Sequence, residues 1–272
     1  MEKLNIMAIG AHPDDCDFRF GGTAIKFLAA GHRVMFLSMT NGCSGHQTSP
    51  GQAMAARRYN ETLAVSKLTG VEYKMTDISD GSLTTDLLYR DVLMREIRAF
   101  KPDMIFTHRP NDYHPDHRAT GTLVMDCSYL VIVPHVVPDS LPLHKTPYIF
   151  HVYDRFKYPT PFVPDVVVEL DSVIDKKTAM LDCHASQVYE WLPFAGGYSA
   201  EVPPEHDKAG RLSWLKTYLE KREPCITGRY KEILIERYGH EKSLHVQRCE
   251  AFQLCEYGAQ GDIKQIRQMF PL

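Results

Sequence analysis

Two short clusters of histidine and aspartate contain the side chains that can do chemistry in this sequence. His12, Asp14 and Asp15 fall within four positions just past the apolar run 4–9, and His114-Pro115-Asp116-His117 follows the apolar run 104–107. Imidazole and carboxylate groups are ligands of Zn²⁺, and catalytic zinc sites combine three such ligands with an open position. The pattern predicts one divalent-metal site built from both clusters.

His12, Asp15 and His117 are the predicted metal ligands. His12 and Asp15 stand three positions apart on a turn, so both side chains can converge on one ion, and His117 completes the set from a second strand end. Two imidazoles and one carboxylate suit Zn²⁺ but leave Fe²⁺, Co²⁺ and Mn²⁺ open. The ligand set therefore predicts a metal site and favours zinc.

The same clusters supply candidates for proton transfer. Asp14 is predicted to be the general base for metal-activated water, although it can also be a simple cap of the turn that follows. His114 shares a helical face with His117, and as an imidazolium it would stabilise an oxyanion and protonate a leaving amine. Asp116 is expected to hold the His114 ring and favour its charged form. These groups predict metal-assisted hydrolysis of an acyl bond.

Apolar runs and amphipathic stretches alternate through the first half of the chain. Strands are expected near 3–10, 33–39, 72–76 and 103–107, and helices near 21–31, with Gly21 and Gly22 at its start, 52–69 and 86–100. Strands separated by helical patterns of this length form βαβ units with parallel pairing. The predicted fold is Rossmann-like α/β, a mostly parallel sheet flanked by helices. Ligands bind such sheets at the carboxyl ends of the strands, where both clusters lie.

The second half of the chain has a less regular pattern. Prolines concentrate between 134 and 164 and favour short, edge-like strands such as 148–152. A strand over 165–170, a helix capped by Asp171, a mobile loop over 193–210 and at least two helices after 211 are expected. The prediction is one domain spanning 1–272, with a core of about 4–190 and an irregular, Pro-rich and helical C-terminal part, in which 191–272 is an extension.

Composition narrows the classes of function. The 272 residues carry a net charge of −3, with Lys and Arg scattered, so no nucleic-acid partner is expected. No apolar stretch approaches the length of a membrane span, and the first residues lack a secretory signal, so a cytoplasmic protein is expected. Seven cysteines without a Cys-x-x-Cys pair fit neither a disulfide framework nor a zinc ribbon.

With these residues in view, the chain resembles the PIG-L/LmbE family of zinc-dependent N-acetylglucosaminyl deacetylases. The opening signature of the family, Ala-His-Pro-Asp-Asp followed by Gly-Gly, is matched by 11–15 and 21–22, and its His-Pro-Asp-His signature by 114–117. Further matches are Thr40-Asn41-Gly42, Arg58-Tyr59-Asn60-Glu61, Gly70, Asp80-Gly81 and His184-Ala185-Ser186-Gln187. The resemblance therefore covers about residues 4–190.

The resemblance implies the same metal ligands, base and electrophilic partner, and a small N-acetyl amino sugar or its conjugate as substrate. It also implies that Arg58 and Asp80 hold sugar hydroxyls, although an Arg on a helix is commonly a surface residue and Asp-Gly a common turn. It makes a homo-oligomer plausible. Cys16 departs from the family pattern, which commonly has an acidic residue at this position. The Cys16 side chain is expected to be a small buried group.

The leading interpretation is a zinc hydrolase that removes an acetyl group from an N-acetylated amino sugar. One alternative is a sugar-binding module of the same fold that keeps the metal but has lost turnover, against which the presence of Asp14 and His114 argues. A second alternative is a nucleotide-binding oxidoreductase. It is disfavoured because the first strand ends in carboxylates, which would repel a pyrophosphate, and not in a glycine-rich turn.

Overall fold

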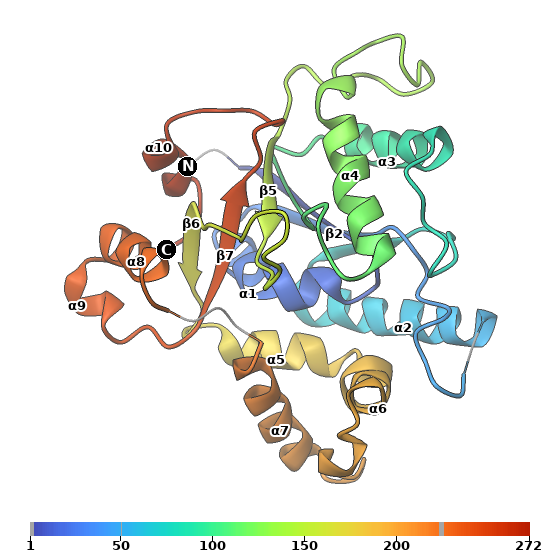
Figure 1. Ribbon diagram of the computed structural model, residues 1–272, viewed down its shortest axis with the longest axis vertical. Coiled ribbons are helices and arrows are strands. Elements are labelled where there is room, and N and C mark those ends of the chain that lie inside the picture. The colour runs from blue at the N-terminus through green and yellow to red at the C-terminus, as the bar shows by residue number, and fades with distance from the viewer. Residues whose placement is uncertain (1–2, 50, 223–225) are drawn as a thin grey trace.

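A seven-stranded sheet forms the centre of the molecule. The computed structural model describes residues 3–49, 51–222 and 226–272. The strands lie in the order β3-β2-β1-β4-β5-β7-β6 (Figure 1). Their bounds are β1 Asn5–Gly10, β2 Arg33–Ser38, β3 Glu72–Met75, β4 Met104–Thr107, β5 Tyr148–Val152, β6 Val166–Glu169 and β7 Cys249–Leu254. The first five strands pair in parallel, and β7 runs antiparallel to β5 and β6. This confirms the predicted α/β fold with a mostly parallel sheet.

The connections reverse direction at β1. The chain passes from β1 to β2 and β3 on one side, then returns to place β4 on the other side of β1, where Ile9 pairs with Thr107. Such a reversal opens a crevice beyond the carboxyl ends of the two central strands, which is the usual ligand site of an open α/β sheet. Both histidine–aspartate clusters follow these two strands, so the topology brings them together.

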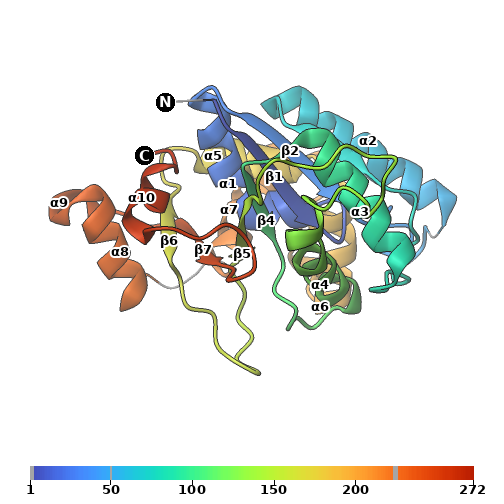
Figure 2. The same ribbon diagram turned by 90° about the horizontal axis from the view of Figure 1, so that it is seen from above.

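Helices cover both faces of the sheet (Figure 2). The helices are α1 Asp15–Ala29, α2 Gln52–Thr69, α3 Leu87–Phe100, α4 Pro115–Leu130, α5 Ile174–Asp182, α6 Leu192–Gly196, α7 Lys208–Glu220, α8 Arg229–Tyr238, α9 His240–Ser243 and α10 Ile263–Gln268. One core cluster joins the sheet to α1, α5 and α10, and a second joins its other face to α3 and α4. Among the described residues, no helix is long and apolar enough to cross a membrane.

The strand β4 is buried on both faces, as expected of a central parallel strand. Phe106 stacks on Phe20 of α1, with 4.2 Å between ring centroids, while its neighbour Ile105 belongs to the opposite core cluster. Phe150 of β5 stacks on the other side of Phe106 at 5.2 Å. This aromatic packing fixes α1 against β4, and with it the first His–Asp cluster against the second.

The first helix begins earlier than predicted. It starts at Asp15, directly after the first cluster, and not at Gly21. Gly21 and Gly22 lie inside the helix, and a Cβ atom on Gly22 would come within 2.5 Å of the Leu170 side chain. Glycine at this point therefore allows α1 to approach the end of β6 closely. From the sequence alone, the pair of glycines had indicated the start of a helix.

The prediction of at least two helices after 211 is confirmed by α8 and α10, although the strand β7 in the same part was not predicted. Two other predictions for the second half are wrong. Asp171 does not cap the helix that follows it, because its carboxylate accepts hydrogen bonds from the backbone of Gln247 and Arg248. The segment 193–210 contains most of α6 and a short 3₁₀ turn, Ser199–Glu201, in place of a continuous loop.

Candidate metal centre

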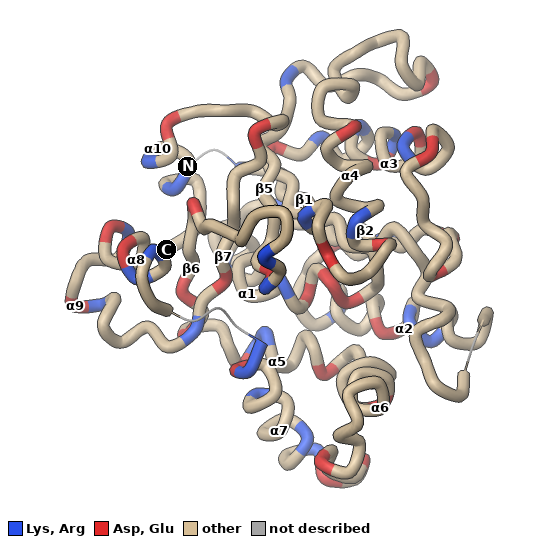
Figure 3. Tube along the Cα trace, in the orientation of Figure 1, with Lys and Arg blue, Asp and Glu red and all other residues tan. Residues whose placement is uncertain are grey.

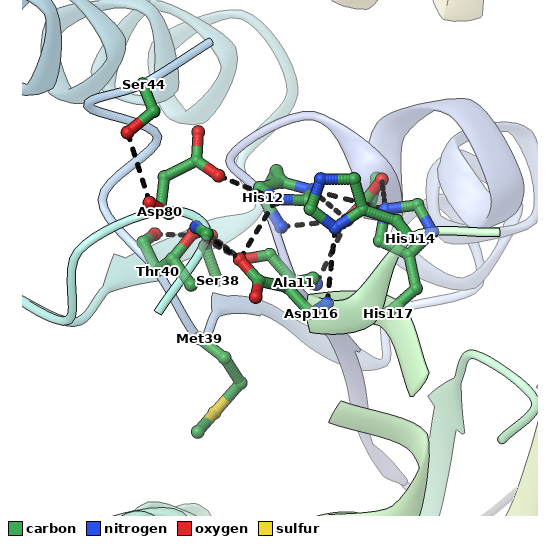
Figure 4. A network of polar contacts seen from close by, with 12 residues as sticks. Ala11, His12, Ser38, Met39, Thr40, Ser44, Asp80, His114, Asp116 and His117 are labelled. Atoms are coloured by element: carbon green, nitrogen blue, oxygen red, sulfur yellow. Dashed lines mark hydrogen bonds and ion pairs between the residues drawn. The ribbon is translucent and has the colours of Figure 1, made fainter. Parts of the chain in front are cut away.

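The two clusters meet beyond the carboxyl ends of β1 and β4. Figure 4 shows the imidazoles of His12, His114 and His117 grouped together, with the carboxylates of Asp80 and Asp116 against them. His12 lies in the turn between β1 and α1, and His117 lies in the first turn of α4. The helix α4 begins at Pro115 with His114 as its N-cap, so His114 and His117 share one end of this helix. The predicted convergence of residues about a hundred positions apart is present.

Asp15 is oriented by the backbone of its own turn. Its Oδ2 atom accepts hydrogen bonds from the amides of Ala11, at 3.0 Å, and His12, at 2.8 Å. A side chain on Gly10 would place its Cβ 2.7 Å from that of Asp15, so glycine is needed for this close turn. Burial raises the pKa of Asp15, but the imidazoles of His117 and His108 outweigh it and hold the pKa well below its usual value. Asp15 is therefore a fixed, ionised carboxylate.

The side chains of His12, Asp15 and His117 form a small triangle in which each Asp15 oxygen faces one of the two histidines. His12 Nδ1 lies 3.2 Å from His117 Nε2 and 3.4 Å from Asp15 Oδ2, and His117 Nε2 lies 3.4 Å from Asp15 Oδ1. Ligand atoms that bind one tetrahedral zinc ion at about 2.0–2.2 Å stand about 3.3 Å apart. The spacing of these three groups therefore fits a single divalent cation, and four further carboxylates nearby, Asp14, Asp80, Asp112 and Asp116, supply negative charge for it.

The second nitrogen of His12 faces two carboxylates. His12 Nε2 lies 3.1 Å from Asp80 Oδ1 and 3.5 Å from Asp116 Oδ2. Burial lowers the pKa of His12, but Asp116, Asp15 and Asp80 together raise it well above the usual value. Such contacts fix the orientation of a ligand imidazole and direct its other nitrogen to the metal. The contact between Asp80 and His12 was not predicted from the sequence, where Asp80 was expected to bind sugar hydroxyls.

The expectation that Asp116 holds the His114 ring is wrong. Asp116 Oδ2 accepts a hydrogen bond of 2.7 Å from the backbone amide of Gly81, and it faces His12. His114 instead accepts a hydrogen bond at Nδ1 from the backbone amide of Asp116, because His114 caps α4. Burial, together with the charges of His12 and His117, lowers the pKa of His114. The ring is therefore held as a neutral imidazole and not as an imidazolium.

His117 has a carboxylate partner that sequence reasoning missed. Its Nδ1 atom lies 3.0 Å from Asp112 Oδ1, while Nε2 faces Asp15 and His12. Burial works against its charge, but Asp15 and Asp112 raise the pKa of His117 to about 9. The signal was present in the sequence, since Asp112 stands five positions before His117, but this spacing alone does not separate a histidine partner from a loop aspartate.

His108 also belongs to the cluster and was also missed. It follows the last residue of β4, its Nε2 lies 3.1 Å from Asp15 Oδ2, and its ring stacks on His117 with 4.1 Å between centroids. Burial, together with His117, lowers the pKa of His108. The carboxyl end of a buried strand is a strong positional signal, but the sequence pattern favoured the denser cluster 114–117 that begins six residues later.

Asp14 and Arg58 form a buried pair at the edge of the cluster. Arg58 Nη2 on α2 lies 3.1 Å from Asp14 Oδ1, and Arg58 is 1% exposed. Its Nε and Nη2 atoms have no hydrogen-bond partner of good geometry among the described residues. Gly42, with φ +64°, leaves the space that Arg58 occupies. Arg58 is thus not a surface residue, and it keeps donors for a group that enters the site.

The cluster opens into a cavity of about 950 Å³. The wall near the cluster includes Asp14, His114 and Arg58, and the opposite wall comes from the C-terminal part of the chain, with Trp191, Tyr198, Trp214, Tyr218 and Arg222. Cys16, by contrast, packs in the core, 5% exposed, and burial raises the pKa of its thiol, so it is the small buried residue that was expected. The cavity is large enough for a sugar with a substituent.

The fold and site define an α/β protein with a candidate metal centre at the switch point of its sheet. Residues 7–128 match the model of the PIG-L family, described as GlcNAc-PI de-N-acetylase. It is similar to the diacetylchitobiose deacetylase of Thermococcus kodakarensis, with 26% identity over 200 residues that cover 70% of this chain and 74% of the relative. It is also similar to the 4-oxalmesaconate hydratase of Pseudomonas putida, with 23% identity over 70% of this chain and 76% of the relative.

Solved structures agree with this placement. The N,N'-diacetylchitobiose deacetylase from Pyrococcus horikoshii superposes with a TM-score of 0.68 at 23% identity, covering 93% of this chain and 84% of that one. At this identity the similarity establishes the fold. The relatives carry out different reactions by name, so the reaction of this chain has to be argued from its own site.

Proposed function

We propose that this protein is a metal-dependent hydrolase, with zinc as the favoured ion, that removes an acetyl group from an N-acetylated amino sugar or its conjugate. The observation that carries the proposal is the triangle of His12, Asp15 and His117 atoms, 3.2–3.4 Å apart, beside the Asp14–Arg58 pair in one cavity. The match to the PIG-L family and the deacetylases among the relatives support the same reaction.

His12, Asp15 and His117 would hold the ion. When bound, a divalent cation there lowers the pKa of water and polarises the amide carbonyl of the substrate. The chain contributes the orientation of the ligands, because Asp80 and Asp112 fix the two imidazoles and the Ala11 and His12 amides fix Asp15. Zn²⁺ suits two imidazoles and one carboxylate, and Fe²⁺, Co²⁺ and Mn²⁺ accept the same set.

Asp14 is the proposed general base. It is adjacent to a proposed ligand, lines the cavity, and is held as an ion pair by Arg58 at 3.1 Å. A carboxylate in this position accepts a proton from the attacking water and returns it to the leaving amine. The pair with Arg58 keeps the acceptor oxygen in place.

His114 is the proposed donor to the oxyanion. Because Nδ1 accepts a hydrogen bond from the Asp116 amide, a neutral His114 carries its proton on Nε2. Its ring lies 4.5 Å from that of His12, at the edge of the cavity. A neutral imidazole that donates from Nε2 stabilises negative charge on the carbonyl oxygen without first being protonated. Asp116 takes part indirectly, through its backbone amide and its contact with His12.

Arg58 is the proposed contact for sugar hydroxyls. Its unpaired donors and its position beside Asp14 support a role in binding the acetamido sugar close to the proposed metal ligands. Asp80 keeps a second oxygen for the same purpose while it holds His12. A sugar-binding module without turnover has no use for Asp14 and His114 on the cavity wall, so the hydrolase is the better interpretation.

The proposal is tested with the purified full chain. Metal content is measured first, and release of free amine from N-acetylglucosamine and its glycosides is then assayed with the metal restored. The expected result is amine and acetate in equal amounts, lost on chelation. Because a hydratase is among the relatives, an unsaturated dicarboxylic acid is assayed in parallel. Hydration of that acid without any amine release would contradict the proposal.

A further inference from the structure

The guanidinium of Arg19 lines the cavity close in sequence to a proposed metal ligand. Arg19 lies on α1 four residues after Asp15, so both side chains project from the same helix face into the cavity. Neither an ion pair nor a hydrogen bond joins the Arg19 side chain to any residue in the part of the chain that the structure describes. It is a half-buried guanidinium beside the proposed reaction centre that feels the charges of Asp15, Asp112 and Asp154 but forms a direct pair with none of them.

Three of the other cations that line the same cavity have acidic partners. Arg58 pairs with Asp14, and Arg109 forms a bidentate pair with Asp154, with both distances between 2.5 and 2.6 Å. Lys177 lies 2.8 Å from Glu250. Charges that are removed from water are normally compensated in this way, because an unpaired buried charge is unfavourable. Figure 3 shows the same mixture of basic and acidic positions along most helices.

Another cation acts on Arg19. Burial, followed by the charge of Arg222, lowers the pKa of Arg19, against the opposite effect of Asp15, Asp112 and Asp154. Arg222 is held in place by its own contact, with its guanidinium 4.4 Å above the Tyr218 ring. Tyr218 in turn stacks on Trp214 at 5.1 Å with 14° between the ring planes. Two guanidinium groups thus line the same cavity, one on α1 and one just after α7.

We propose that Arg19 and Arg222 form an anion subsite that binds a carboxylate or phosphate group of the substrate, beyond its acetamido sugar. The proposal rests on the proposed function. An anion between the two groups removes their mutual repulsion, and the planar fork of each guanidinium matches the oxygens of either anion. Arg19 is one helical turn, about 5.4 Å, from Asp15, so the anion is placed about one sugar ring from the acetyl group. The Trp214 and Tyr218 rings cover the linkage.

The test uses three N-acetylglucosaminides that differ only in the end of the aglycone, which is a carboxylate, a phosphate or a neutral carboxamide. Wild-type enzyme is expected to prefer at least one anionic substrate over the neutral one by about tenfold or more in kcat/KM, mainly through KM. In R19Q and in R222Q this preference is expected to fall to about threefold or less. The better of the two anions identifies the natural group. R95Q, which removes the same charge from the exposed face of α3, serves as the control and should keep the preference.

Two results overturn the subsite. One is equal kcat/KM for all three substrates with wild-type enzyme, and the other is an undiminished preference in both R19Q and R222Q when each variant is folded by circular dichroism. If none of the substrates releases amine, the proposed function fails and the subsite is judged by calorimetry of the anionic glycosides. Binding that is lost in R19Q but kept in R95Q then supports it, and equal binding by both variants overturns it.

Discussion

His117 Nδ1 lies 3.0 Å from Asp112 Oδ1, and the opposite ring nitrogen of His117 faces Asp15 at 3.4 Å. An imidazole held in this way between two carboxylates has one orientation and one nitrogen for a metal ion. Asp112 also anchors the entry to α4, because its Oδ1 accepts a hydrogen bond from the His114 amide. One carboxylate therefore positions both histidines of the second cluster.

Asp112→Asn is expected to weaken metal affinity by about 10–100-fold, because it removes the charge that orients His117. The measurement is a competition titration with a chromogenic chelator. Asp126→Asn, at an exposed position of α4, removes the same charge away from the cluster and should leave the affinity unchanged. Equal affinities of the two variants would show that Asp112 does not orient a ligand.

Asp14→Asn is expected to lower kcat by about 10²–10⁴-fold while metal content stays at the wild-type level. The physical reason is that an amide cannot accept the proton, although it still fills the space beside Arg58. Steady-state kinetics and metal analysis are run on the same preparation. Asp86→Asn, which changes an exposed N-cap of α3, is the control. Wild-type kcat in Asp14→Asn would remove this residue from the mechanism.

The stability of the metal-free protein is expected to fall between pH 6.5 and about 9. The pKa of His117 is raised to about 9 in the folded chain, so its protonated form stabilises the fold. That contribution is complete below the unfolded value of about 6.5 and is lost as the pH rises through the folded value, with an upper bound of about 3 kcal/mol. Urea unfolding at pH 6, 7.5 and 9.5 measures it. A free energy of unfolding that rises with pH in this window would contradict the assignment.

When the protein is saturated with metal, the free energy of unfolding is expected to rise with pH over the same range. The ion and the proton compete for His117, so metal affinity is expected to increase as the pH rises toward 9. Asp112→Asn, which removes one of the two carboxylates at His117, should show a smaller pH dependence in both measurements. Comparison of this variant with the wild-type protein thus separates the contribution of His117 to the pH dependence from the contributions of other titrating groups.

Gly42→Ala is expected to reduce both stability and activity. Gly42 has φ +64°, and an added Cβ would lie 3.1 Å from Pro13 and 3.4 Å from Arg58. The left-handed backbone costs about 1–2 kcal/mol for alanine, and the contact displaces Arg58, so KM should rise. Gly70→Ala is the matched control, since Gly70 has φ +86° at the end of α2 with no atom within 4 Å. It should lose similar stability and keep its KM.

The fold of the first half and the meeting of the two clusters could be predicted because both depend on short-range patterns. Buried runs such as 104–107 and the amphipathic helices between them specify parallel βαβ units, and the connection rules bring the strand ends together. Residue types and positions then pointed to His12, Asp15 and His117. The side chains at these positions do converge, as sequence reasoning required.

The features that were missed depend on contacts between distant residues. Asp116 was expected at His114, but the loop that carries Gly81 turns the carboxylate toward His12. His108 and Asp112 joined the cluster because β4 and α4 hold them against Asp15 and His117, which no local spacing reveals. The strand β7 was missed because its pairing partners lie about a hundred residues away.

The part of the chain after residue 190 contributes a strand to the central sheet. We propose that 1–272 folds as a single domain in which 191–272 is not a separable extension. β7 lies between β5 and β6 in the sheet, and β6 is hydrogen-bonded to no other strand within the described ranges 3–49, 51–222 and 226–272. Phe252 of β7 also packs on Phe106, with 4.9 Å between centroids. Removal of β7 therefore opens the sheet and exposes the aromatic core.

A fragment of residues 1–190 is expected not to unfold cooperatively, in contrast to the full chain, when both are followed by circular dichroism and calorimetry. A milder variant, Phe252→Ala, tests the same contact in the intact chain and should destabilise it by about 3–5 kcal/mol, because the side chain is fully buried. Tyr257→Ala, at a residue that is 62% exposed, is the control and should change stability by about 0.5 kcal/mol or less. A fragment 1–190 that melts cooperatively and binds one metal ion would instead make 4–190 an independent core, since the pocket wall from α7 would then be dispensable for folding.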